Sequence, residues 1–164
     1  TIPTRQNEPR RLVEKTRAGM SYFRSQQIFD AVPVNRVLED YWLQCQEQGL
    51  QPQTIFLSFV PIPNERRIAI LRDLSVVIPE DAERTLHANG GRKAMRRASI
   101  DVAKGLLYEI LAYADRQGIK VPLGLDIESF FAGPVSVELA AELMDELEDV
   151  AKYYRNPAIF KGSQ

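Results

Sequence analysis

The stretch from Leu74 to Tyr113 constrains the fold most, because the spacing of its apolar residues changes along it. They recur at every second position at first, and at every third or fourth position later. Apolar residues stand at every second position from Leu74 to Ile78, which predicts a short strand. Pro79 and the acids after it predict the first turn of a helix. Gly90 and Gly91 predict the end of that helix, and a longer amphipathic helix follows. The sequence therefore predicts a strand-helix-helix unit.

The rest of the chain is predicted to be mostly helical, in an α+β fold with a small antiparallel strand element. The elements expected outside the unit are a helix near Arg11 to Phe29, a helix from Pro33 to Gly49, a strand from Thr54 to Val60, a second extended stretch from Arg67 to Ile78, and a last helix from Pro134 or Ser136 through Val150. We expect a single domain with an arm at 1–10, N-terminal helices and a strand at 11–70, the unit at 71–117, and an acidic C-terminal helix and tail at 118–164.

The composition excludes several classes of protein. The 164 residues are 45% apolar and 26% charged, which is typical of a globular domain and not of a collagen or a disordered chain. Cys45 is the single cysteine and His87 the single histidine, so no internal disulfide and no Cys/His zinc cluster can form. No window is apolar over the roughly 18 residues that a membrane span needs. We expect a cytoplasmic protein without enzymatic activity, metal, cofactor or membrane contact.

Charge is segregated along the chain. Residues 64–104 carry nine Lys or Arg against six Asp or Glu, whereas residues 123–150 carry eight acids and no base. The densest basic cluster is Arg92, Lys93, Arg96 and Arg97, in which residues four apart share one helix face and can meet one phosphate backbone. A solvated helix face is the alternative interpretation of this basic cluster.

The stretch from Leu74 to Tyr113 resembles a ribbon-helix-helix DNA-binding unit. In that family the strand pairs antiparallel with the same strand of a second subunit, and the two-stranded ribbon enters the major groove. The resemblance implies a homodimer on double-stranded DNA. It also implies a set of DNA-binding residues, in which Arg72, Ser75 and Val77 face the bases and Arg92, Lys93, Arg96 and Arg97 face phosphates.

The segments Asp81–Arg92 and Arg96–Ala98 are similar to AcaB-like transcriptional regulators of conjugative plasmids and integrating conjugative elements. This similarity implies an activator of transfer genes, with RNA polymerase or another regulator as a further partner. The alternative is a non-enzymatic adaptor or accessory factor of a mobile element, which would use the acidic last helix and the aromatic pair Tyr41 and Trp42. The basic cluster distinguishes the regulator hypothesis from the adaptor hypothesis, because a DNA-binding protein needs such a cluster and an adaptor does not.

Overall fold

The computed structural model describes residues 7–87, 91–128 and 134–155, which form helices and strands. The elements, in chain order, are α1 (Glu8–Arg17), β1 (Tyr22–Gln27), α2 (Ala31–Glu47), β2 (Thr54–Phe59), α3 (Glu65–Asp73), α4 (Glu80–His87), α5 (Gly91–Arg116), β3 (Leu123–Ile127) and α6 (Pro134–Arg155). Within the described ranges, no helix has both the length and the apolar character that crossing a membrane requires.

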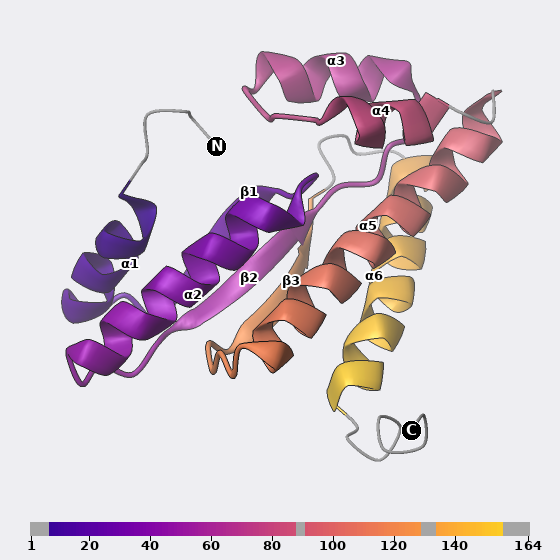
Figure 1. Ribbon diagram of the computed structural model, residues 1–164. Coiled ribbons are helices and arrows are strands. Elements are labelled where there is room, and N and C mark those ends of the chain that lie inside the picture. The colour runs from indigo at the N-terminus through magenta and orange to yellow at the C-terminus, as the bar shows by residue number, and fades with distance from the viewer. Residues whose placement is uncertain (1–6, 88–90, 129–133, 156–164) are drawn as a thin grey trace.

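The three strands form one parallel sheet in the order β1-β2-β3 (Figure 1). The predicted α+β ribbon-helix-helix class with a small antiparallel element is therefore wrong, and the fold is α/β. The physical reason lies in the connections. Parallel neighbours need a long crossover, and α2 supplies the first crossover while α3, α4 and α5 make the second. An antiparallel ribbon would instead need the same strand from a second subunit.

The stretch predicted to be the ribbon strand is not a strand. Leu74 caps the end of α3, and Ser75 has a left-handed backbone with φ of 60°. Val76 is buried, whereas Leu74 is 50% exposed and Val77 is 59% exposed, so the alternation does not mark one face of a sheet. The period-two pattern arose from a helix end joined to a turn.

Other predicted elements agree with the structure to different degrees. The helix expected from Pro33 to Gly49 is confirmed as α2, the strand from Thr54 as β2, and the long helix before Gly118 as α5. The helix expected near Arg11 to Phe29 is instead α1 followed by β1. The predicted stop at Gly90 lies outside the described residues, whereas Gly91 begins α5 with a positive φ. β3 was not predicted at all.

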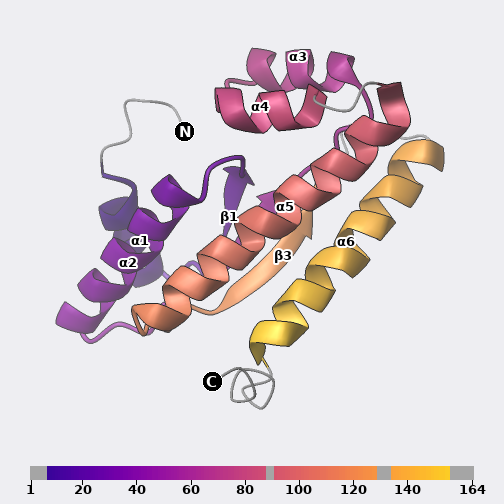
Figure 2. The ribbon, with the colours of Figure 1, turned by 45° about the vertical axis from the view of Figure 1, so that its right-hand side comes forward.

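Helices α2, α5 and α6 lie on one side of the sheet (Figures 1 and 2). For α2 and α5 this follows from the strand order, because two crossovers of the same hand that step in one direction place their helices on one face. Helix α6 follows β3 and packs against α5. We call the opposite side of the sheet the open face. On it the side chain of Arg24 is 51% exposed and Tyr22 is 54% exposed.

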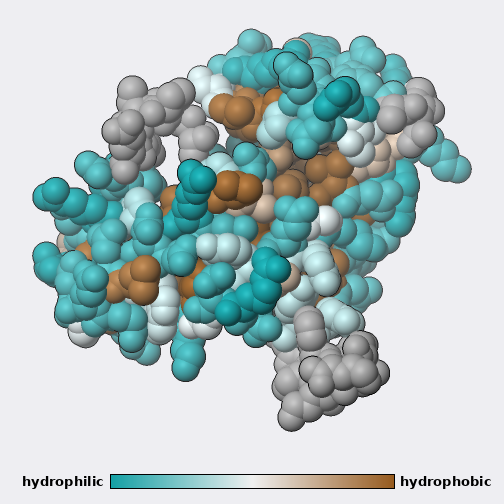
Figure 3. All heavy atoms as spheres, in the orientation of Figure 1, coloured by the Kyte–Doolittle hydropathy of each residue, from teal (hydrophilic) through white to brown (hydrophobic). Residues whose placement is uncertain are grey.

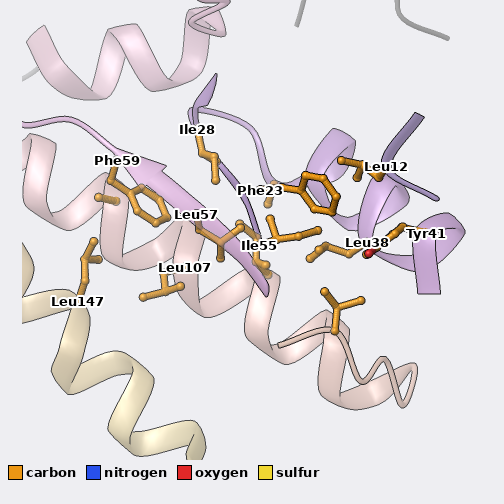
Figure 4. Close-up of a cluster of buried hydrophobic side chains, with 14 of the residues drawn as sticks. Leu12, Phe23, Ile28, Leu38, Tyr41, Ile55, Leu57, Phe59, Leu107 and Leu147 are labelled. Carbon is orange, nitrogen blue, oxygen red and sulfur yellow. The ribbon is translucent and has the colours of Figure 1, made fainter. Parts of the chain in front are cut away.

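The main core fills the space between the sheet and these helices (Figure 4). Ile55 and Leu57 of β2 point toward Leu38 of α2 and Leu107 of α5, and each of the four is no more than 6% exposed. Tyr41 is fully buried beside them, and its hydroxyl accepts a 2.9 Å hydrogen bond from the backbone N–H of Gln53. Burial raises the pKa of the Tyr41 hydroxyl.

A second, smaller cluster lies under the α3–α4 pair, which follows β2 at the carboxyl end of the strands. Ile62, Leu71 and Leu86 are its most buried members. In Figure 3 brown side chains gather between this pair and the layer of α2 and α5. The cavity beside it measures about 10 Å³, which is room for about one water molecule and too small for a ligand.

Candidate functional site

Polar side chains gather on the open face near the carboxyl ends of the three strands. They are Arg24 and Gln27 of β1, Ser58 of β2, Asp126 of β3 and Glu128 just after β3, and we call them the Arg24 cluster. Parallel sheets are usually covered on both faces, so a polar and partly exposed face is unusual. The polarity and the partial exposure of this face make the Arg24 cluster the candidate site.

Arg24 is the centre of the cluster and reaches across β2. Its Nη2 donates to Asp126 Oδ2 at 2.6 Å and to Glu128 Oε1 at 3.0 Å, and its Nε lies 3.2 Å from the same Asp126 oxygen. Ser58 Oγ, which is buried, donates to Asp126 Oδ2 at 2.9 Å. Within the described part of the chain, no donor reaches Asp126 Oδ1. Asp126 Oδ1 is thus the oxygen of this carboxylate that the described residues leave without a donor.

A β-bulge in β1 shapes this site. The pairing of β1 with β2 is regular up to Arg24 and resumes at Gln27 with a shifted register. At the irregularity Ser25 Oγ accepts a 2.9 Å hydrogen bond from the backbone N–H of Ser58. Residues three apart in a regular strand point to opposite faces, yet Arg24 and Gln27 both donate to Glu128. Such bulges re-aim side chains beside functional sites.

The electrostatics of the cluster favour the charged form of Arg24. The hydrogen bond to Asp126 raises the pKa of the Arg24 guanidinium, and the charges of Asp126 and Glu128 add to this. One guanidinium faces two carboxylates, whose side chains are 24% and 23% exposed. With two acids and one base, the three charged residues have a formal charge of −1, and a ligand that binds the carboxylates needs hydrogen-bond donors.

An aromatic pair continues the open face toward the start of the strands. The rings of Tyr22 and Phe56 meet edge to face, with centroids 5.8 Å apart. The Phe56 ring lies directly over Gly124, where a Cβ atom would stand 2.6 Å from Phe56 Cδ1. An exposed aromatic surface beside a carboxylate can pack against a flat ring and hydrogen-bond its edge. Among the described residues, no group of three or more His, Cys, Asp and Glu side chains is placed to hold a metal ion.

The residues predicted to read bases lie around the α3–α4 connection. Arg72, on the last turn of α3, pairs through Nη2 with Glu83 Oε2 of α4 and links the two helices. Ser75 and Val77 are exposed in the loop between them. His87 of α4 lies beside Glu83 with 3.7 Å between Nε2 and Oε1. The ribbon that would carry these residues into a groove is absent from the described fold.

The residues predicted to contact phosphates lie in the first turns of α5. Arg92 and Lys93 are exposed, and within the described part of the chain no acid forms an ion pair with either of them. Arg96 is half-buried. Arg97 instead pairs with Asp101 at 3.2 Å and with Glu146 of α6 at 3.3 Å, and the nearby Asp101 charge is the main cause of its raised pKa. Of the predicted basic cluster, Arg92 and Lys93 thus have no ion pair with a described acid, whereas Arg97 is exposed and paired.

Sequence reasoning missed the Arg24 cluster. Arg24 and Asp126 are 102 positions apart, so no local motif joins them. The signal that could have found one partner is the period-two pattern of Leu123, Leu125 and Ile127, which marks a strand with Asp126 on its other face. From the sequence, this segment is assigned to the acidic C-terminal helix and tail, where no strand is expected.

Comparison with known proteins supports the fold. No family model matches the chain, and no curated protein matches it. A solved structure of an uncharacterized protein from Clostridium thermocellum that binds two copies of 5-methyl-5,6,7,8-tetrahydrofolic acid is similar to this chain, with a TM-score of 0.71 and 21% identity. The match covers 87% of this chain and 48% of that one, so this chain spans about half the length of its neighbour. The likeness shows a shared fold.

Proposed function

We propose that this chain binds a small, flat, polar ligand of the reduced-folate class on the open face of its sheet. The observation that carries the proposal is Asp126, whose Oδ2 is held by Arg24 and Ser58 while its Oδ1 takes no hydrogen bond from a described residue. Carboxylates bind paired N–H donors strongly because the hydrogen bonds are charge-assisted. Asp126 would be the group that recognises the ligand.

The chemistry of a reduced folate matches the groups on this face. Its pterin ring has an amino group and a ring N–H side by side, a donor pair that suits a carboxylate such as Asp126. Its ring can pack on Tyr22 and Phe56, and its glutamate tail offers carboxylates to Arg24. The Clostridium thermocellum protein that shares the fold binds 5-methyltetrahydrofolate, which makes this ligand the first to test.

Calorimetric titration of the full chain with 5-methyltetrahydrofolate tests the proposal. We expect saturable binding by the wild-type chain and a loss of about tenfold or more in affinity for Asp126→Asn, because a hydrogen bond to a charged group contributes roughly 1.5–3 kcal/mol. Asp101→Asn is the matched control, because Asp101 is exposed on α5 and pairs with Arg97. Equal affinity of the wild type and Asp126→Asn, or no binding by the wild type, would refute the proposal.

Contact with the phosphate backbone of double-stranded DNA is the second candidate function. It is favoured by the exposure of Arg92 and Lys93 at the start of α5, where backbone N–H groups also favour anions. A gel-shift titration against salt should show weaker binding for Arg92→Ala and a salt slope lower by roughly one unit per lost contact. Unchanged binding across the titration would remove this candidate. A homodimer and a role as regulator or adaptor stay predictions, which sedimentation with and without DNA can test.

A further inference from the structure

The guanidinium of Arg24 and the edge of a pterin ring offer the same kind of hydrogen-bond donors. Each has N–H groups on nitrogens that share one carbon atom, and each suits a carboxylate. In the structure Arg24 donates to one oxygen of Asp126 and to one oxygen of Glu128. A pterin edge, which presents two donors, would use both oxygens of Asp126 and must therefore take Oδ2 from Arg24. A ligand that binds there has to compete with Arg24.

We propose that Arg24 sets the ligand selectivity of this site. It competes with the ring of any pterin for the carboxylates, and it binds the anionic tail of a ligand that has one. This inference rests on the proposed function and names the part of the ligand that decides binding. A ring without a tail must displace Arg24 and leaves its charge unpaired. A ring with a carboxylate tail displaces Arg24 and provides it with a new partner.

The exposure of the cluster makes this exchange possible. The side chain of Arg24 is 51% exposed, so it can turn away without opening the core, whereas the carboxylates of Asp126 and Glu128 are 24% and 23% exposed and stay in place. Ser58 fixes Asp126 from below, and Gln27 donates to the second oxygen of Glu128. The acceptors are thus held by other residues when Arg24 leaves.

The test compares two probes, 5-methyltetrahydrofolate and 6-methyltetrahydropterin, which has no glutamate tail, by calorimetry on the full chain. For the wild type we expect the tailed ligand to bind more tightly. In Arg24→Gln we expect the pterin to bind more tightly than it does to the wild type, and the preference for the tailed ligand to fall about tenfold or more. Arg10→Gln is the control, because Arg10 is an exposed arginine on α1 that pairs with Glu14.

The conservative variant Arg24→Lys provides a second check, with thermal melting by circular dichroism to confirm that each variant is folded. Its ammonium group can still bind a tail carboxylate, so we expect it to keep a preference for the tailed ligand. If Arg24→Lys loses that preference, or if Arg24→Gln keeps the wild-type ratio, the selectivity role is overturned while the binding site stands. If the wild type binds neither probe, the proposed function fails and this inference fails with it.

Discussion

Gly124 shows how a single residue shapes the open face. The Phe56 ring fills the space that a side chain at this position would need, with 2.6 Å and 2.7 Å between a built Cβ atom and two carbons of the ring. Carbon atoms cannot approach this closely, so any other residue would move the ring. Glycine at this position leaves room for the Phe56 ring, which also meets the Tyr22 ring edge to face.

Gly124→Ala should therefore lower the free energy of unfolding by about 1–3 kcal/mol, the usual cost of overpacking. Urea unfolding at equilibrium measures the change. Gly105→Ala is the matched control, because Gly105 lies in helix α5 with no atom within 4 Å of a built Cβ, and alanine there should stabilise the chain by about 0.5–1 kcal/mol. A stable Gly124→Ala variant with an unchanged midpoint would mean that Phe56 is not held over β3.

Arg24 belongs to no motif in the sequence, and its role could not be predicted there. Its partners Asp126 and Glu128 follow it by more than a hundred positions. Only the sheet order, which places β2 between β1 and β3, tells which carboxylates Arg24 can reach. The basic cluster at Arg92 was visible because its members are close in sequence, and closeness in sequence says nothing about what the cluster binds.

At the scale of elements, the contact between α5 and α6 combines an apolar seam with a charged rim. Leu107 of α5 and Leu147 of α6 are buried in the main core. At the rim, Glu146 of α6 accepts a hydrogen bond from Lys104 and another, at 3.3 Å, from Arg97. The Lys104 hydrogen bond is the main reason why the pKa of Glu146 lies below its ordinary value.

Because the pKa of Glu146 is lower in the folded state, its ionised form contributes to the free energy of unfolding. This contribution is fully present above the unfolded-state pKa of about 4.3, and it is lost as the pH falls through the folded-state pKa. Glu146→Gln should thus reduce the free energy of unfolding by up to about 1 kcal/mol at pH 7, and the difference from the wild type should shrink in acid. Chemical unfolding at pH 7 and pH 3 measures both. Glu142→Gln, on an exposed position of α6, should differ from the wild type at neither pH. A difference for Glu146→Gln that persists in acid would contradict this account.

The elements that could be predicted are those whose own sequence decides them. α2 and α5 have apolar residues at helical spacing and end before Gly49 and Gly118, which both have a positive φ. β2 is rich in aromatic and branched residues and is followed by Pro61. β1 was not predicted because Phe23 is its one buried residue, so its sequence does not show the apolar alternation of a strand. The parallel direction could not be predicted from any one segment, since it depends on how separate segments pair.

At the scale of the whole molecule, the two clusters of buried apolar residues differ in size. The main cluster joins the sheet to α2, α5 and α6, and the smaller one, with Ile62 and Leu86, holds the α3–α4 pair. Regions with less buried apolar area open locally at lower free energy than the main core. The molecule should therefore unfold in at least two steps when it is observed residue by residue.

Native-state hydrogen exchange in low denaturant checks this expectation. We expect amides of α3 and α4 to exchange through an opening of lower free energy than amides of β2, such as that of Leu57, which exchange through global unfolding. Thr85, on α4, is a suitable reporter for the pair. Equal opening free energies for Thr85 and Leu57 would show a single cooperative unit and refute the two-cluster interpretation.

The β-bulge in β1 links what this protein can recognise to the length of one strand. Because the extra residue between Arg24 and Gln27 is what turns both side chains toward Glu128, deletion of Ser25 would restore regular alternation and turn one of them away. Relatives that differ here by one residue would then present a different set of donors with the rest of the face unchanged. A new ligand specificity on this face would therefore arise by insertion or deletion of a residue at the bulge more readily than by substitution. This holds for evolution and for protein engineering.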